Sequence, residues 1–253
     1  MTIAGSDSCG GAGIQADLKT FNACAVQAAS VLTAITAQNT AGVSQVTLLS
    51  PDMVQAQLRA VLDELPIRAA KTGMLANAEI IETVITGLTA SPDLCLVVDP
   101  VMVATSGARL LDRNAEAAMR ERLLPRATLV TPNLPEAAAL TGLAEDHPVE
   151  ALGEALLALG CKAVLLKGGH SRGERVEDLL LTPDSEARFS HPRRPMQVHG
   201  TGCALSAAIA AHIARGENLE TAVDQAINWL QQQLDHAWTA PNGKLAMLPF
   251  ASA

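Results

Sequence analysis

The sequence has no tyrosine, three phenylalanines and two tryptophans, so aromatic side chains are scarce. Proteins that bind single-stranded nucleic acid stack the bases on aromatic side chains, and this chain offers few of them. Apolar residues nevertheless make up 49% of the 253 residues, which is enough for a sizeable buried core. That core must be built mainly from leucine, valine, isoleucine and alanine.

Basic residues are also in the minority, because 18 lysines and arginines stand against 26 acidic residues and the formal net charge is −8. A general affinity for nucleic acid or for an anionic membrane needs a basic surface, so we expect neither partner. The sequence has no apolar run of the roughly 18 residues that suggest a membrane span, and no export signal at its start. We therefore expect a globular cytoplasmic protein that holds any anionic ligand in a local site.

The five cysteines lie far apart, and no two of them have the C-x-x-C spacing of a zinc or redox site. We interpret them as reduced thiols, most of them small core residues.

Short apolar, β-branched runs alternate with segments of helical periodicity along the whole chain. A strand at Thr2–Ala4, a helix with apolar residues at positions 14, 18 and 21, and a strand at Ser30–Thr36 form the beginning of this pattern. Ser50 followed by Pro51 indicates the start of the next helix. The alternation predicts an α/β fold with a mainly parallel sheet covered by helices on both faces, a three-layer α/β/α sandwich. Because no linker divides the chain, we predict one domain over residues 1–253.

The later elements follow the same alternation. Strands are expected to end at Lys71–Gly73 and to lie at Leu94–Asp99, Ala127–Thr131 and Ala163–Lys167. Helices are expected near Ala76–Leu88, near Asp112–Leu124, from Asn133, and near Val149–Leu159, Ala204–Arg215 and Leu219–Ala237. The segment Glu174–Gln197 looks like a small β-hairpin flap with a turn at its tip, and we expect it to act as a lid.

The glycine-rich segment Gly5–Gly13 follows the first strand and precedes a helix, so it could hold a phosphate. Its Gly11-Ala-Gly13-Ile-Gln-Ala16 matches the dinucleotide fingerprint only loosely, because no acidic residue follows between Asp17 and Asp52 to bind a ribose. The Lys-Ser/Thr pair of a P-loop is absent as well. Close packing of helix and strand is the alternative role of these glycines.

A better phosphate site is His199-Gly-Thr-Gly-Cys203, which directly precedes a helix. Backbone N–H groups at a helix start form a ready anion site, and glycines let the ligand approach them. The helix dipole there predicts a lowered pKa for Cys203. A plain helix start with a small buried cysteine remains the alternative.

Taken together, the polar segments resemble one known family. They resemble, in order, the bacterial hydroxymethylpyrimidine/phosphomethylpyrimidine kinases of thiamin biosynthesis, in the ribokinase-like superfamily. The resemblance runs from the first residue to about Ala237 and rests on seven segments. These are Gly5–Thr20, Ala37–Thr40, Lys71–Leu75, Asp99–Met102, Thr131–Glu136, Lys167–His170 and His199–Cys203.

The resemblance implies which residues bind the pyrimidine. Gly5 and Asp17 would line its pocket, and Gln38 would hydrogen-bond the aminopyrimidine edge with its paired donor and acceptor. Met74 and Val101 would form apolar walls, although both could be ordinary core side chains.

The resemblance also implies a site for ATP and magnesium. Asp99 and Glu136 would be the metal ligands. Asn133, Lys167 and Thr201 would contact the nucleotide, and Lys167 would meet its phosphates. A helix-start glutamate and a surface lysine are the plainer interpretations of Glu136 and Lys167.

For the reaction, the resemblance implies transfer of the ATP γ-phosphoryl group to the hydroxymethyl oxygen, and then a second transfer to the monophosphate. The backbone amides of Gly200, Thr201, Gly202 and Cys203 would stabilise the transferred group together with Mg²⁺ and Lys167. Cys203 would take the hydroxyl proton, at a position where most sugar kinases of the superfamily have aspartate.

Two alternatives stay open. Some relatives are pyridoxal kinases, although the lack of tyrosine and the presence of Gln38 favour the aminopyrimidine. The second alternative is a non-catalytic pyrimidine-sensing protein. The presence of all the expected catalytic residues argues against it. The resemblance further implies a homodimer, whereas the C-terminal segment around Lys244 departs from the family pattern.

Overall fold

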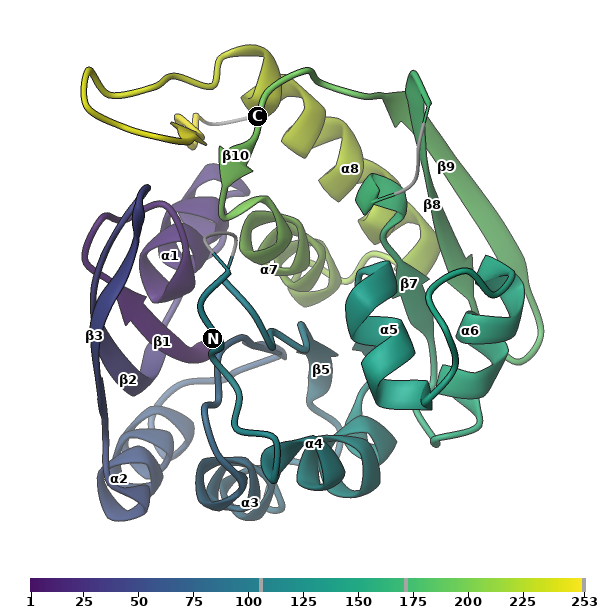
Figure 1. Cartoon of the computed structure of the whole chain (residues 1–253). Helices are drawn as coiled ribbons and strands as arrows, with labels where there is room; N and C mark the ends of the chain where they lie inside the picture. Colours follow the sequence, from purple (N-terminus) through teal and green to yellow (C-terminus); the bar gives the residue numbers. More distant parts are fainter. Residues whose placement is uncertain (105–106, 171–172, 252–253) are drawn as a thin grey trace.

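A nine-stranded sheet forms the centre of the computed structural model, which describes residues 1–104, 107–170 and 173–251. The strand order is β3-β2-β1-β4-β5-β6-β7-β8-β9, and the strands from β2 to β7 in this order run parallel (Figure 1). The strands of this sheet are β1 (Thr2–Asp7), β2 (Ser30–Asn39), β3 (Gly42–Leu48), β4 (Ala69–Thr72), β5 (Cys95–Val98), β6 (Leu129–Val130), β7 (Val164–Leu166), β8 (Arg175–Leu181) and β9 (Glu186–Pro192). Two short strands, β10 (Val198–His199) and β11 (Ala246–Met247), form a separate parallel pair.

Helices cover both faces of this sheet. One face carries α1 (Gly13–Ala23), α7 (Thr201–Ala214) and α8 (Leu219–Asp235), and α7 packs on β4 and β5 (Figure 1). The other carries α2 (Pro51–Leu62), α3 (Ala78–Gly87), α4 (Ala115–Ala118), α5 (Leu134–Thr141) and α6 (Val149–Leu157). Within the described residues no helix is long and apolar enough to span a membrane.

The two faces bury separate aliphatic cores. On β5, Leu96 and Val98 belong to the core beneath α2–α6, whereas Val97, which points the other way, belongs to the core beneath α1, α7 and α8. This alternation follows from the period of two along a strand. The predicted three-layer α/β/α class is confirmed, and so is the helix start at Ser50, whose hydroxyl accepts the Met53 N–H.

The predicted flap is part of the main sheet. β8 pairs antiparallel with β7, and β9 pairs antiparallel with β8, so the hairpin extends the sheet at its edge. Because β8 runs against the parallel strands, the turn after Leu181 lies at their amino ends. The tip of the hairpin is therefore remote from the carboxyl edge, whereas its other end, with Val176, Asp178 and His191, lines a cavity there. That the segment Glu174–Gln197 acts as a lid stays a prediction.

Two other elements differ from the sequence-based expectation. β2 continues through Gln38 to Asn39 and turns back into β3, a hairpin that was not foreseen. The helix expected near Asp112–Leu124 is instead a short α4, a π-helical turn at Met119–Leu123 and a 3-10 turn at Leu124–Arg126. Pro125 lacks the N–H needed to continue a helix.

Candidate active site

A cavity of about 810 Å³ opens at the carboxyl ends of the parallel strands, where ligands bind in open α/β sheets. Its volume is in the range of small-molecule sites. All the predicted site residues except Asp17 line it: Gly5, Gln38, Met74, Asp99, Val101, Asn133, Glu136, Lys167, Gly200, Thr201, Gly202 and Cys203. The strand order thus brings together residues that lie nearly two hundred positions apart.

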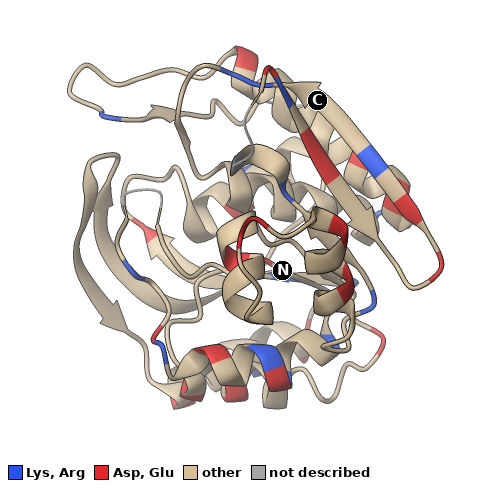
Figure 2. Ribbon diagram, turned by 45° about the vertical axis from the view of Figure 1, so that its right-hand side comes forward, with Lys and Arg blue, Asp and Glu red and all other residues tan. Residues whose placement is uncertain are grey.

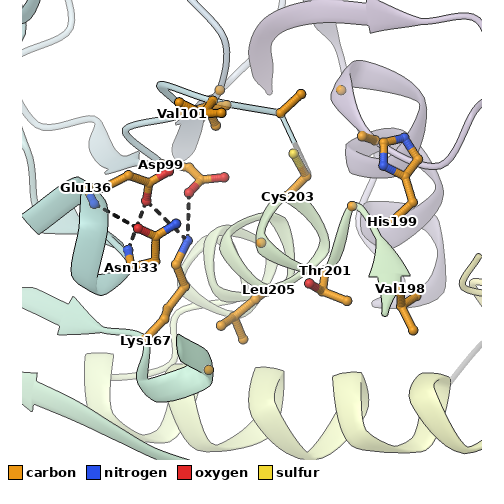
Figure 3. Close-up of a pocket in the computed structure, with 18 of the residues that line it drawn as sticks. Asp99, Val101, Asn133, Glu136, Lys167, Val198, His199, Thr201, Cys203 and Leu205 are labelled. Carbon is orange, nitrogen blue, oxygen red and sulfur yellow. Dashed lines mark hydrogen bonds and ion pairs between the residues drawn. The ribbon is translucent and has the colours of Figure 1, made fainter. Parts of the chain in front are cut away.

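A cationic side chain between two carboxylates forms one end of the cavity (Figure 3). Lys167 Nζ lies 3.1 Å from Asp99 Oδ1 and 4.0 Å from Glu136 Oε2. Burial alone would lower the pKa of Lys167, but the two carboxylates raise it. Asp99, which follows β5 and is 2% exposed, also accepts weak hydrogen bonds from Thr131 and Ser206 at 3.4 Å each. Lys167 is therefore a fixed positive charge.

A capping box holds Glu136 at the start of α5. The Asn133 side chain accepts the Glu136 N–H at 2.8 Å, and Glu136 Oε2 accepts the Asn133 N–H at 2.9 Å. Burial raises the pKa of Glu136 to about 7, with Asp99 adding to the shift and Lys167 opposing it. Glu136 is thus a helix-start residue, as the plainer interpretation held. Its side chain also faces Lys167.

The start of α7 forms the floor between this cluster and the rest of the cavity (Figure 3). Its N-cap, Gly200, has a φ of 78°, and none of the described side chains caps this helix, whose first turn contains no acidic residue. The first N–H groups of a helix have no partner inside the helix. Gly202 lies beside the cluster, since a Cβ on it would be 3.3 Å from Lys167 Nζ. The geometry suits an anion held between these amides and Lys167.

The pKa of Cys203 differs from the expectation. Burial raises the pKa of this thiol to about 11, and Asp17 and Asp99 add to the rise while Lys71 opposes it. The helix start was expected to lower the pKa, but desolvation of the thiolate outweighs the dipole at this position. Cys203 is therefore a thiol at neutral pH, and the prediction of a lowered pKa is corrected.

Small and apolar groups line the opposite end of the cavity. Gly5 lies against Met74, because a Cβ on Gly5 would be 3.2 Å from Met74 Sδ. The Met74 carbonyl accepts the Thr33 hydroxyl at 2.6 Å, which fixes this part of the backbone. Gln38 faces the cavity from the end of β2, and its Oε1 accepts the Thr36 hydroxyl at 3.2 Å.

Asp17 is buried beneath the cavity and does not line it. Both of its carboxylate oxygens lie 3.0 Å from Lys71 Nζ, and Thr2 donates a third hydrogen bond. Asp17 and Lys71 are both 0% exposed. Asp17 was placed at the pyrimidine by resemblance, and the structure corrects this, because the side chain points from α1 into the sheet toward β4.

Sequence reasoning missed a buried pair that lines the cavity, Asp7 with His199. His199 Nε2 lies 2.9 Å from Asp7 Oδ2, and Asp7 also accepts the backbone N–H groups of Cys9, Gly11 and Ala12. Burial would raise the pKa of Asp7, but its hydrogen bonds with His199 and with the backbone lower it. An aspartate directly after a strand and before glycines was the available signal for this pair.

A second missed residue is Asp178, on β8. It is 4% exposed, accepts the Gly168 N–H at 2.8 Å, and lies 3.1 Å from His191 Nε2. Asp178 therefore fixes the turn directly after Lys167. The end of the β8–β9 hairpin that contains Asp178 and His191 lies at the cavity, and the tip of the hairpin lies at the opposite end.

Comparison with known proteins gives the family. A family model described as phosphomethylpyrimidine kinase matches residues 7–247. The hydroxymethylpyrimidine/phosphomethylpyrimidine kinase of Escherichia coli (strain K12) is 47% identical over 247 residues, which are 96% of this chain and 93% of that protein. The one from Bacillus subtilis (strain 168) is 40% identical over 93% of this chain and 89% of that protein.

Solved structures agree with this result. The crystal structure of phosphomethylpyrimidine kinase from Clostridium difficile 630 has a TM-score of 0.81 and 42% identity, covering 91% of this chain and 96% of that one. Pyridoxal kinase from Staphylococcus aureus in complex with AMP-PCP and pyridoxal has a TM-score of 0.89 and 33% identity, covering 99% of this chain and 92% of that one. The predicted ribokinase-like kinase class is confirmed, and this chain belongs to the hydroxymethylpyrimidine/phosphomethylpyrimidine kinase family.

Proposed function

We propose that this protein transfers the γ-phosphoryl group of ATP to hydroxymethylpyrimidine and then to the resulting monophosphate, in thiamin biosynthesis. One observation carries the proposal in a chain of this family. A single cavity joins Lys167 and Asp99 to the start of α7 and to a small-residue pocket around Gly5 and Met74. The first part suits the nucleotide phosphates, and the second suits a small flat acceptor.

The reaction would depend on positioning and on stabilisation of charge, since phosphoryl transfer passes through a loose transition state. The amides of Gly200–Cys203 would donate hydrogen bonds to the transferred group, and Lys167 would neutralise its oxygens from the side. Gln38 would bind the aminopyrimidine edge, while Met74 and Val101 would hold its ring between apolar walls. Asn133 would orient the nucleotide from the start of α5.

The donor set also fits a magnesium ion. Asp99 and Glu136 place two carboxylates on either side of Lys167, and Mg²⁺ in kinase sites takes one or two carboxylates together with water and phosphate oxygens. We propose that these two residues hold it, directly or through water. When bound, the ion would supply positive charge that offsets the negative charge of the phosphates.

Replacing Lys167 with methionine tests the nucleotide end of the site. The change should lower kcat by about 10²–10³-fold, as the loss of one preorganised group at a developing charge does elsewhere. Lys162→Met is the matched control, because this exposed lysine lies only five positions earlier and should leave kcat unchanged. A Lys167→Met enzyme whose kcat stays within about threefold of the wild type would contradict the assignment.

Cys203 is proposed to take the hydroxyl proton, and its raised pKa makes this testable. Only the thiolate can act as a base, and below a pKa of about 11 its fraction rises about tenfold per pH unit. We expect kcat to rise from about pH 7 to about pH 9 in the wild type, and to be flat and at least about 10²-fold lower in Cys203→Ala.

Cys95→Ala serves as the control for Cys203, because Cys95 lies at the start of β5 and does not line the cavity. A loss of only a few-fold in Cys203→Ala, with the pH profile retained, would eliminate the base role. Cys203 would then contribute only its backbone amide to the anion site.

The acceptor is distinguished by a substrate panel. The similarity to a pyridoxal kinase structure that holds pyridoxal makes pyridoxal phosphorylation the second candidate function. ADP release with Mg-ATP should be compared for hydroxymethylpyrimidine, its monophosphate, pyridoxal, pyridoxine and ribose. We expect the first two to give the highest kcat/KM, and activity with pyridoxal alone would favour the second candidate.

Three further expectations stay proposals. One sheet formed by strands from residue 2 to residue 192 supports a single domain over residues 1–253. Free thiols at all five cysteines suit a reducing cytoplasm. Exposed apolar side chains on β2, β3 and α2, namely Ile35, Val46, Leu48 and Met53, support a homodimer.

Acidic and basic residues are interspersed on the helices and along β8 and β9 (Figure 2), which agrees with small-molecule partners.

A further inference from the structure

Three side chains with different metal-binding atoms meet at the acceptor end of the cavity. Asp7 ends β1, Cys9 lies in the loop that follows, and His199 comes from β10. One ligand atom from each lies within 4.8 Å of the other two. We propose that Asp7, Cys9 and His199 form a binding site for a zinc ion, separate from the magnesium site and beyond the proposed kinase activity.

The donor atoms select the class of metal. A carboxylate oxygen, a thiolate and an imidazole nitrogen are the three ligand types that Zn²⁺ takes in proteins. Mg²⁺ is bound by oxygen alone and would not be attracted to sulfur and nitrogen. Ligand atoms around a tetrahedral zinc lie about 3.3–3.8 Å apart, so side-chain rotations that bring these atoms about 1 Å closer would complete the site. The fourth position would be open to water or to a ligand in the cavity.

Asp7 is already held in the position that a metal ligand needs. Its Oδ1 accepts the Cys9 N–H at 2.9 Å, and its Oδ2 accepts the N–H groups of Gly11 and Ala12 at 3.1 and 2.8 Å. Hydrogen bonds of this kind fix a ligating carboxylate and its orientation. The side chain is 2% exposed, so little of its freedom remains to be lost.

The ring nitrogens of His199 are incompletely hydrogen-bonded without a metal. Its Nε2 lies between an acceptor, Asp7 Oδ2 at 2.9 Å, and a donor, Gln38 Nε2 at 3.2 Å, and the ring nitrogen can serve only one of them. Its Nδ1 is buried and has no hydrogen-bond partner within the described part of the chain. Moving the proton from Nε2 to Nδ1 gives up the hydrogen bond to Asp7, and it frees the Nε2 lone pair to bind the metal together with the Asp7 carboxylate.

Cys9 supplies the ligand that makes the site specific for a softer cation. Its side chain is partly exposed, and its Sγ lies 3.9 Å from the thioether sulfur of Met247. On binding, the S–H bond breaks, a Zn–S bond forms, and the proton passes to solvent. Zinc affinity should therefore rise with pH.

The site is coupled to the acceptor pocket through shared residues. Asp7, Gln38 and His199 all line the cavity. When His199 turns its Nε2 to zinc, it leaves the Gln38 amide, which the proposed function assigns to the pyrimidine. Zinc should therefore weaken acceptor binding, whereas Mg-ATP at Asp99 and Glu136 should leave zinc binding unchanged.

Cobalt(II) is the probe, because it takes zinc sites and a cobalt–thiolate bond gives a charge-transfer absorption in the near ultraviolet. We expect the wild-type protein to show this band at one Co²⁺ per chain, with or without excess Mg-ATP, and to lose it when Zn²⁺ is added. The band should vanish in Cys9→Ser and persist in Cys95→Ser, the matched control. No band in the wild type, or a band that survives in Cys9→Ser, would overturn the proposal. This readout is independent of kinase activity, so its outcome is distinguishable from failure of the proposed function.

A second measurement needs no variant. The alkylation rate of Cys9 in the wild type should fall at least about tenfold when Zn²⁺ is bound, as read by mass spectrometry of the peptide that contains it. Reversal by a chelator is expected. An alkylation rate of Cys9 that zinc leaves unchanged would overturn the proposal.

Discussion

Replacing Lys71 with methionine should lower the free energy of unfolding by about 3–5 kcal/mol, the usual effect of removing one partner of a buried ion pair. Lys71 and Asp17 are fully buried and lie 3.0 Å apart. Burial raises the pKa of Asp17, whereas the positive charge of Lys71 lowers it. Without the lysine, Asp17 must stay charged in an apolar setting or take up a proton. Chemical denaturation at neutral pH measures the change.

Two controls make this test specific. Arg122→Met removes one partner of the exposed Arg122–Glu82 pair at 3.1 Å and should change the free energy of unfolding by less than about 1 kcal/mol. The double variant Lys71→Met/Asp17→Leu removes both buried charges and should recover at least about half of the loss. A loss in Lys71→Met no larger than that in Arg122→Met would contradict the account.

Replacing Gly200 with alanine should lower kcat/KM by about 10²–10³-fold, because it displaces the amides at the start of α7. A Cβ at this position would lie 1.8 Å from the Gly11 carbonyl oxygen, and the φ of 78° also disfavours a side chain. The loop must therefore move away from the glycine-rich segment that it touches. Steady-state kinetics of the folded variant measure the effect.

Gly216→Ala separates backbone strain from the displacement of the loop. Gly216 has a φ of 95°, and no atom in the described part of the chain lies within 4 Å of where its Cβ would be. This variant should lose about 1 kcal/mol of stability through strain alone and keep its kcat/KM. Equal kinetic losses in the two alanine variants would show that the contact with Gly11 is not what positions the anion site.

Much of the fold follows from local patterns in the sequence. Continuous apolar strands such as Cys95–Val98 and helix starts such as Ser50 carry their signal within a few residues. The β2–β3 hairpin does not, because its register depends on pairing with β1 and its outer strand is mostly exposed. The position of β8 and β9 likewise depends on which edge of the sheet is free to accept them.

The candidate site was predictable to the extent that its residues follow strand ends. Asp99, Lys167 and the loop before α7 are such residues, and parallel strands bring them to one edge. Asp17 lies inside a helix, so the direction of its side chain depends on the packing of α1 against β1 and on its ion pair with Lys71 of β4. The pKa of Cys203 was misjudged for a related reason, because the depth of its burial is not visible in the residues around it.

The central claim is that one cavity transfers phosphoryl groups from ATP to the pyrimidine alcohol and then to its monophosphate. Phosphorus NMR of the protein incubated with hydroxymethylpyrimidine and Mg-ATP tests this directly, with Lys167→Met as the control. We predict a monophosphate that appears first, a diphosphate that replaces it, and two ADP for each pyrimidine consumed. No phosphorylated pyrimidine from the wild-type enzyme, or equal product from Lys167→Met, would contradict the claim.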